Sequence, residues 1–230
     1  IRLSLVGSEM CIRDSPHSWY QRIAGPRLAM DSVHMPYAVP NQREERSDCD
    51  PGLPTGAWRS VGASQNAFAI EGFVDELAHH AGADPLRYRL ALLQEEPRYR
   101  RVLEVATAKA GWGARARAGR GLGVAVYRSF GGWVAQVAEA SVQGGSIRVH
   151  RVVAAIDCGF AVNPSSVVAQ VEGAVAFGLS AALCEEITVR DGRVQQTGFD
   201  NYSILTFDRM PEVEVHIVDS DAPPLSLIHI

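Results

Sequence analysis

A chain of 230 residues with 47% hydrophobic and 21% charged side chains has the composition of an ordinary globular protein, long enough for one large domain or two small ones. Its 22 basic and 26 acidic residues leave a net charge of -4, which argues against a nucleic-acid-binding protein, since that class shows a basic excess. The four cysteines, Cys11, Cys49, Cys158 and Cys184, lack the spacing of a zinc site or a redox pair. We therefore expect neither a disulfide framework nor iron–sulfur ligation by this chain.

Both ends differ in character from the rest of the chain. The first fifteen residues, IRLSLVGSEMCIRDS, show no regular period, and the last six, LSLIHI, break off a polar stretch. Both strings resemble translated sequencing-adaptor remnants; a natural disordered start and a natural closing strand are the alternative. We expect residues 1–15 and 225–230 to be foreign and residues 16–224 to be part of a longer protein. A targeting signal that decides between the cytoplasm and the periplasm would then lie outside the chain.

Three helices are predicted after an irregular, proline-rich region at residues 16–54. The first covers residues 66–82. A second begins at Asp84 and Pro85, residue types that favour the N-cap and the first helical position. A third covers residues 99–110 and ends before a glycine. The predicted apolar face of the first helix carries Phe68, Ala69, Phe73, Leu77 and Ala81. Its predicted acidic face carries Glu71, Asp75 and Glu76.

Strands dominate the second half of the chain. Residues 121–129 alternate between apolar side chains and small or polar ones, and residues 133–156 read as a hairpin around the turn Gln-Gly-Gly. A second hairpin, at residues 185–196, turns at an Asp-Gly pair. Residues 212–220 alternate valine or isoleucine with charged residues and predict a last strand.

One long helix is predicted between the two hairpins, with Asn163 as its N-cap and Pro164 at its first position. Its predicted apolar stripe consists of Val167, Val171, Ala174, Gly178 and Ala182. Since Gln170 and Glu172 interrupt this segment, we interpret it as a buried helix and expect no membrane span. Helices followed by strands with one central helix predict an α+β fold with a mostly antiparallel sheet.

The central helix also carries features that suit a ligand. Its first amides follow a strand end and form a natural anion site. Gln170 borders the predicted buried face, where its amide can both donate and accept. Gly173 and Gly178 are costly inside a helix and indicate close approach of another backbone or of a ligand. Close helix–sheet packing with a surface glutamine is the simpler alternative, which spacing alone favours.

A resemblance covers residues 16–224 in the right order. DCGxxVNPxxVxAQxEGxxxxGLxAALxEEI resembles the second molybdopterin-binding region of the molybdenum hydroxylases, the xanthine dehydrogenase and aldehyde oxidase superfamily. TGAWRSVGAS, followed by NAFAIEGFVDELAHHAGADPLRYRLALL, is similar to the branch of the isoquinoline 1-oxidoreductase beta-subunit type. PYAVPN and EVEVHIVDS match that branch as well.

The resemblance implies a catalytic subunit that holds a molybdenum–molybdopterin cytosine dinucleotide. It implies insertion of oxygen from water beside a ring nitrogen or at an aldehyde carbon of a small-molecule substrate. Electrons would leave through a small subunit with [2Fe–2S] clusters, with a cytochrome c as a candidate acceptor. The absence of a cluster-type cysteine pattern fits this split arrangement. We expect no nucleic-acid partner.

The resemblance also assigns roles to single residues. Arg59 matches the arginine of the family's turn beside the molybdenum oxo group, and Gly62 lets the backbone approach. Gln65 matches a family glutamine, and Gln170 matches the glutamine that hydrogen-bonds the pterin. Val61 stands in the substrate pocket where the xanthine and aldehyde branches place an aromatic residue, which supports the isoquinoline-like branch. No metal-ligand set is predicted in the chain itself.

Two parts of the family pattern are missing from the sequence. A Gly-Gly-Phe-Gly-type segment would lie before residue 16, and the general-base glutamate would follow Pro224, where LSLIHI stands. Because a positioned base is worth about 100- to 10,000-fold in rate, we expect this chain to be inactive alone. The alternatives are a non-catalytic binding or assembly module on the same fold, and part of an aldehyde oxidase or carbon monoxide dehydrogenase large subunit.

Overall fold

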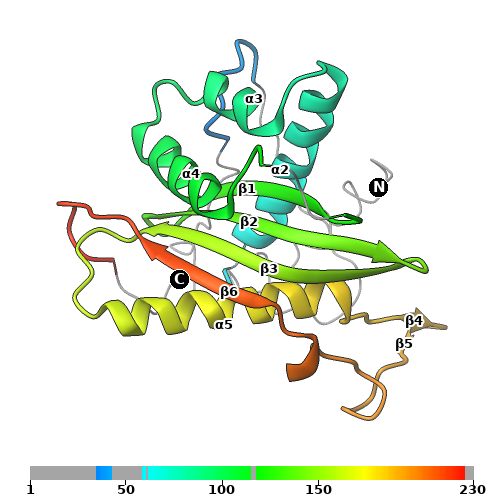
Figure 1. The fold of residues 1–230 in the computed structure, drawn as a ribbon. Helices are drawn as coiled ribbons and strands as arrows, with labels where there is room; N and C mark the ends of the chain where they lie inside the picture. The colour runs from blue at the N-terminus through cyan, green and yellow to red at the C-terminus, as the bar shows by residue number, and fades with distance from the viewer. Residues whose placement is uncertain (1–34, 43–58, 61, 115–117, 226–230) are drawn as a thin grey trace. The chain divides into compact units, whose positions relative to one another are not determined.

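The computed structural model describes residues 35–42, 59–60, 62–114 and 118–225 (Figure 1). They belong to two compact units, one ending at Pro97 and the other beginning at Arg98. Each unit is considered by itself. The expectations for residues 1–15, for residues 226–230 and for Val61 lie outside the described residues.

The first unit contains the helices α2 (Ala63–His80) and α3 (Pro85–Leu92). The side chain of Asp84 accepts a hydrogen bond from the amide of Arg87 at 3.0 Å and so caps α3 as predicted. The predicted apolar face of α2 is wrong. Phe68 and Phe73 are 56% and 46% exposed, whereas Glu71 on the predicted acidic face is buried.

A buried arginine explains the reversed face of α2. Arg89, which is fully buried, donates from Nε to Glu71 at 2.9 Å and from Nη1 to Asp75 at 2.6 Å. Tyr37 donates to the other oxygen of Glu71 at 2.7 Å, and the amide of Ala38 donates to the carbonyl of Leu92 at 2.8 Å. Burial acts to lower the pKa of Arg89, but the carboxylates of Glu71 and Asp75 keep it above its ordinary value. This network joins residues 35–42 to both helices.

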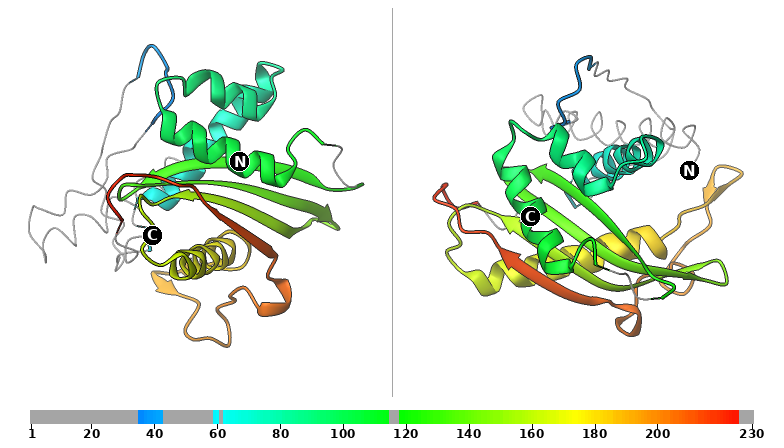
Figure 2. Two further views of the ribbon diagram at one scale, coloured as in Figure 1. Left: turned by 60° about the vertical axis from the view of Figure 1, so that its left-hand side comes forward. Right: turned by 45° about the horizontal axis from the view of Figure 1, so that its top comes forward.

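The second unit is a sheet with a helix on each face (Figures 1 and 2). Its strand order is β1-β2-β3-β6, with β1, β2 and β3 antiparallel and β6 parallel to β3. The α+β fold with a mostly antiparallel sheet is thus confirmed. The bounds are α4 (Pro97–Ala110), β1 (Gly121–Ser129), β2 (Gly132–Gln143), β3 (Ser146–Asp157), α5 (Pro164–Leu183) and β6 (Glu212–Ile217).

Alternation along the strands builds a core on each face. On one face, Ala154 and Ile156 of β3 pack with Val167 and Val171 of α5. On the other face, the ring of Trp133 on β2 meets the ring of Tyr99 on α4 edge-on, with centroids 6.3 Å apart. Buried residues of this second face are Val124, Val126, Ala135, Val137, Val153 and Ala155, and those of α4 are Val102, Leu103 and Ala106.

Helix α5 begins as predicted, because Asn163 accepts a hydrogen bond from the amide of Ser166 at 3.1 Å. Its buried stripe follows Val167, Val171 and Val175, so the predicted continuation through Gly178 is wrong. By length and composition alone, α5 is long and apolar enough to cross a membrane. One such helix is weak evidence, and this one packs on a sheet.

Residues 184–211 connect α5 to β6. They contain the strands β4 (Val189–Arg190) and β5 (Arg193–Val194), joined by the predicted Asp-Gly turn, and the short 3₁₀ helix η1 (Phe207–Arg209). The buried hydroxyl of Ser180 accepts from the amide of Leu205 at 2.9 Å and ties this connection to α5.

Candidate cofactor-binding site

Three of the predicted site residues meet at the start of α2. Ser60 has a left-handed backbone (φ 65°), and its hydroxyl donates to the carbonyl of Arg59 at 2.5 Å. The carbonyl of Ser60 accepts from the amide of Ala63 at 3.0 Å, so the chain turns directly into the helix. Gly62 occupies the N-cap position and brings no side chain to it. The turn therefore holds Arg59 beside the first turn of α2.

Gln65 lies on that first turn and has an unusual side chain. Its Oε1 is buried and has no hydrogen-bond partner in the part of the chain that the structure describes. Leaving such an acceptor unpaired costs about 1–3 kcal/mol. A ligand with N–H or O–H donors would satisfy it.

Arg59 is half-buried and lies six residues before Gln65 in the sequence. A guanidinium remains charged and presents a planar set of donors, which suits oxygen ligands. Together, Arg59, Gly62 and Gln65 offer a cation, an open backbone and a buried acceptor within seven residues. Val61, which lies between them in the sequence, is outside the described residues.

Gln170 belongs to the second unit and lies on the exposed side of α5. The sequence pattern places it at the border of the buried face, but the buried stripe runs through Val167, Val171 and Val175 and leaves Gln170 outside. A Cβ on Gly178 would meet no atom within 4 Å, so no other backbone approaches it closely in the described structure. This side of α5 therefore presents an amide beside small residues.

Sequence reasoning missed the group around Asp157, where β3 ends. Arg98 binds this carboxylate with two hydrogen bonds, Nε to Oδ2 at 2.6 Å and Nη2 to Oδ1 at 2.5 Å. The Arg98 guanidinium also lies 3.6 Å from the centre of the Trp133 ring. Burial acts to raise the pKa of Asp157, but the hydrogen bonds from Arg98 and the amide of Gly159 lower it overall. The only sequence signal was an acid at a predicted strand end.

Comparison with known proteins identifies the family. Residues 75–211 match the family described as the molybdopterin cofactor-binding domain. The chain belongs to this family. It is similar to the beta subunit of the isoquinoline 1-oxidoreductase of Brevundimonas diminuta, with 33% identity over 80% of this chain and 24% of the relative. It is also similar to a subunit of the nicotinate dehydrogenase of Pseudomonas putida, with 32% identity over 82% of this chain and 17% of the relative.

A solved structure agrees on the fold. The aldehyde oxidoreductase from Desulfovibrio desulfuricans superposes with a TM-score of 0.59 over 95% of this chain and 40% of its own, at 14% identity. At that identity the likeness concerns the fold alone. The chain spans about a quarter or less of the length of the two curated relatives above.

The described residues fit a molybdopterin cofactor by their chemistry. Gln65 supplies a buried acceptor that has no partner among the described residues, and a pterin ring system carries N–H donors. Arg59 supplies donors for oxygen atoms. Among the described residues, no group of three or more His, Cys, Asp or Glu side chains could hold a metal ion. The described site thus suits a cofactor held by hydrogen bonds.

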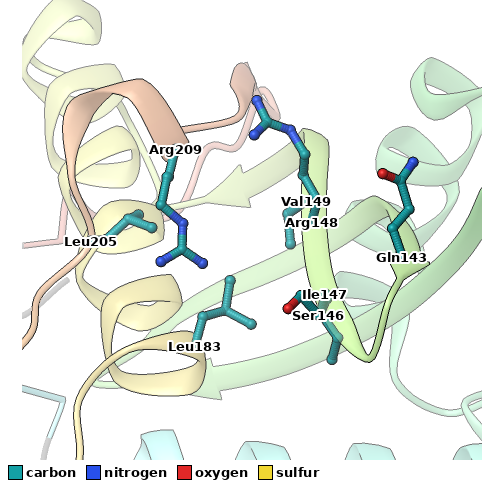
Figure 3. A pocket seen from close by; sticks show the side chains of 8 residues that line it. All are labelled: Gln143, Ser146, Ile147, Arg148, Val149, Leu183, Leu205 and Arg209. Carbon is teal, nitrogen blue, oxygen red and sulfur yellow. The ribbon is translucent and has the colours of Figure 1, made fainter.

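A cavity of about 240 Å³ lies elsewhere on the second unit (Figure 3). Leu183 at the end of α5 lines it, together with the β2–β3 turn and Arg209 of η1. Gln170 is thirteen residues before Leu183, which is about 20 Å along the helix axis. None of the predicted site residues lines this cavity.

Proposed function

We propose that the chain forms part of the large subunit of a molybdenum-dependent hydroxylase. This oxidoreductase would act on an N-heteroaromatic or aldehyde substrate and take its oxygen from water. The observation that carries the proposal is the match of residues 75–211 to the molybdopterin cofactor-binding domain. Relatives that bear the names of an oxidoreductase and a dehydrogenase support it.

The cofactor in this proposal is the molybdenum–molybdopterin cytosine dinucleotide. When bound, this group supplies oxygen transfer from water and accepts the two electrons of the substrate. Arg59 would donate to its oxygen ligands, and Gly62 would leave room for the close approach. Gln65 would accept from an N–H group of the pterin, which would satisfy the buried Oε1. Gln170 would both donate to the cofactor and accept from it, and Val61 would face the substrate.

The proposal includes partners for the electrons. A small subunit with [2Fe–2S] clusters would accept them, with a cytochrome c as a further acceptor. The cysteine spacing supports this split, because Cys158 and Cys184 are separated by the whole of α5 and show no cluster pattern. We propose residues 16–224 as the cofactor-binding part and residues 1–15 and 225–230 as foreign to it.

We also propose that the general base lies outside this chain. We propose that a glutamate follows the position of Pro224 in the complete protein, and that the 230-residue chain alone neither retains molybdenum nor turns over. We do not assign this role to Glu185, whose carboxylate accepts from the hydroxyl of Tyr202 at 2.8 Å on the connection after α5.

The test begins with a long read through the encoding locus. The longest reading frame is then expressed in cells that make the cytosine dinucleotide cofactor, and molybdenum is measured by mass spectrometry. We expect about one molybdenum per chain, dye reduction with an N-heteroaromatic or an aldehyde, and loss of metal in Gln65→Ala and Arg59→Ala. Gln94→Ala, at an exposed position of the first unit, is the matched control. A folded, molybdenum-free product with no acidic residue at the base position would favour the binding or assembly module instead.

A further inference from the structure

The segment 218–224, here called the strap, lies along the end of β3 and the turn after it. The amide of Val218 donates to the carbonyl of Ile156 at 2.8 Å, which continues the pairing of β6 with β3. Further on, the amide of Phe160 donates to the carbonyl of Ala222 at 2.9 Å. These two backbone hydrogen bonds hold a segment that has no helix or strand of its own.

Gly159 leaves the space that the strap occupies at the end of β3, and this contact region is here called the seat. It has a left-handed backbone (φ 70°), and a Cβ placed on it would lie 2.1 Å from the carbonyl oxygen of Pro223 and 2.8 Å from that of Ala222. Both atoms are backbone, so they cannot move aside as the end of a flexible side chain would. Any other residue at this position would displace the strap.

Asp157 ties the seat to the rest of the unit. Its carboxylate accepts from Arg98, from the amide of Gly159 at 3.1 Å and from the hydroxyl of Ser220 on the strap. One buried carboxylate therefore connects α4, the turn and the strap. The Arg98 guanidinium keeps this carboxylate ionised, and an ionised acceptor makes the stronger hydrogen bonds.

We propose that Arg98, Asp157 and Gly159 are positioning residues: they seat the strap and so deliver the polypeptide after Pro224 to a fixed place near the start of α5. This inference rests on the proposed function, in which that polypeptide carries the general base. A catalytic group has to be held within about 0.5 Å of its productive place, and an error of about 1 Å costs on the order of 100-fold in rate. None of the three residues is assigned a contact with the substrate.

The first test uses the 230-residue chain and needs no cofactor. Cys158 is 2% exposed and lies between Asp157 and Gly159, the two residues that contact the strap. Burial also raises the pKa of its thiol, so it should react slowly with N-ethylmaleimide while the strap is in place. Labelling at Cys158 and at the half-buried Cys184 is followed by peptide mass spectrometry, with circular dichroism as the check on folding. We expect Gly159→Ala to raise the rate at Cys158 at least tenfold and to leave that at Cys184 unchanged.

Two further variants keep the test decisive. Gly178→Ala is the matched control, because its Cβ meets nothing within 4 Å, and it should leave Cys158 protected. Ser220→Ala removes one hydrogen bond of the strap with little risk to folding, and it should raise the rate at Cys158 by about threefold or more. A wild-type labelling rate at Cys158 in a folded Ser220→Ala or Gly159→Ala chain overturns the proposal.

The second test uses the product of the longest reading frame. There, Gly159→Ala should lower kcat at least tenfold with KM and molybdenum content unchanged, because only the base is displaced. An unchanged kcat overturns the positioning role. Failure of the proposed function is a separate result, since it would show as absence of molybdenum in the unsubstituted protein.

Discussion

Arg98 clamps Asp157 with two hydrogen bonds of 2.6 and 2.5 Å while its guanidinium lies over the ring of Trp133. The carboxylate side chain is only 3% exposed, and the arginine side chain is 32% exposed. The pair joins α4 to the end of β3, the point at which the chain turns toward α5. The geometry of the second unit at this point thus depends on one ion pair.

Removal of the arginine should therefore destabilise the second unit. In Arg98→Gln the buried carboxylate loses its charged partner, and we expect a loss of about 2 kcal/mol in the free energy of unfolding, below the 3–5 kcal/mol of a fully buried pair because Arg98 is partly solvated. Urea unfolding at pH 7 measures it. Arg100→Gln is the control, since its pair with Glu104 is exposed, and it should cost less than about 0.5 kcal/mol. Equal losses in the two variants would contradict the assignment.

The same pair predicts a pH dependence. The pKa of Asp157 is lowered in the folded chain, so the unfolded chain binds its proton more readily and stability rises with pH. The contribution of the carboxylate should be complete above about pH 4, near the pKa of a free aspartate, and should disappear as the pH falls through the lower folded value. The difference in unfolding free energy between wild type and Asp157→Asn, measured from pH 7 to pH 2, should shrink below pH 4. A difference that grows toward acid pH would exclude this assignment.

Local signals in the sequence predicted most of the elements and missed one buried face. The caps Asp84 and Asn163 and the Asp-Gly turn each act through neighbouring residues, so their positions could be read from the sequence. The face of α2 could not, because Glu71 is buried by Arg89, eighteen residues away, and helical periodicity takes no account of a charged partner on another helix. The stripe of α5 failed at Gly178 for a related reason. The core of the sheet ends before the helix does.

The site was predicted through resemblance more than through physical pattern. Arg59, Gly62 and Gln65 do come together at the start of α2, since they are close in sequence and a helix begins there. Their roles toward a cofactor stay a prediction, as does that of Gln170. The contacts of Asp157 and Gly159 could not be predicted from an acid at a strand end, because they involve Arg98, about sixty residues earlier, and the strap, about sixty residues later.

The buried network of the first unit offers a test of its stability. Arg89 is fully buried and bonds two carboxylates, so Arg89→Met removes the guanidinium that binds the buried Glu71. We expect a loss of about 3–5 kcal/mol. The double variant Arg89→Met with Glu71→Leu should recover at least half of this loss, because both buried charges are gone. Hydrogen exchange of peptides from α2 and α3 measures the change in this unit, and no recovery in the double variant would argue against a charge effect.

Gln65 should show a conflict between stability and function. In the chain without cofactor its Oε1 is buried without a partner among the described residues, so Gln65→Leu should raise the free energy of unfolding by about 1 kcal/mol. Gln196→Leu is the comparison, since that amide bonds the amide and hydroxyl of Thr188 and its loss should destabilise the chain. Thermal unfolding of both variants measures this. A destabilised Gln65→Leu would show that the side chain already has its partner within the chain.

Replacing helical glycines that have open space around them with alanine should stabilise the chain. A Cβ on Gly178 of α5 or on Gly72 of α2 would meet no atom within 4 Å, and neither residue has a positive φ. Alanine should therefore stabilise each helix by up to about 1 kcal/mol, since glycine is that much less favourable in a helix interior. Both changes are measured by urea unfolding of the 230-residue chain. In the complete protein, Gly178→Ala also tests why a glycine stands at this position. If it stabilises the 230-residue chain but lowers the cofactor content of the complete protein, the glycine leaves space for the cofactor beside α5.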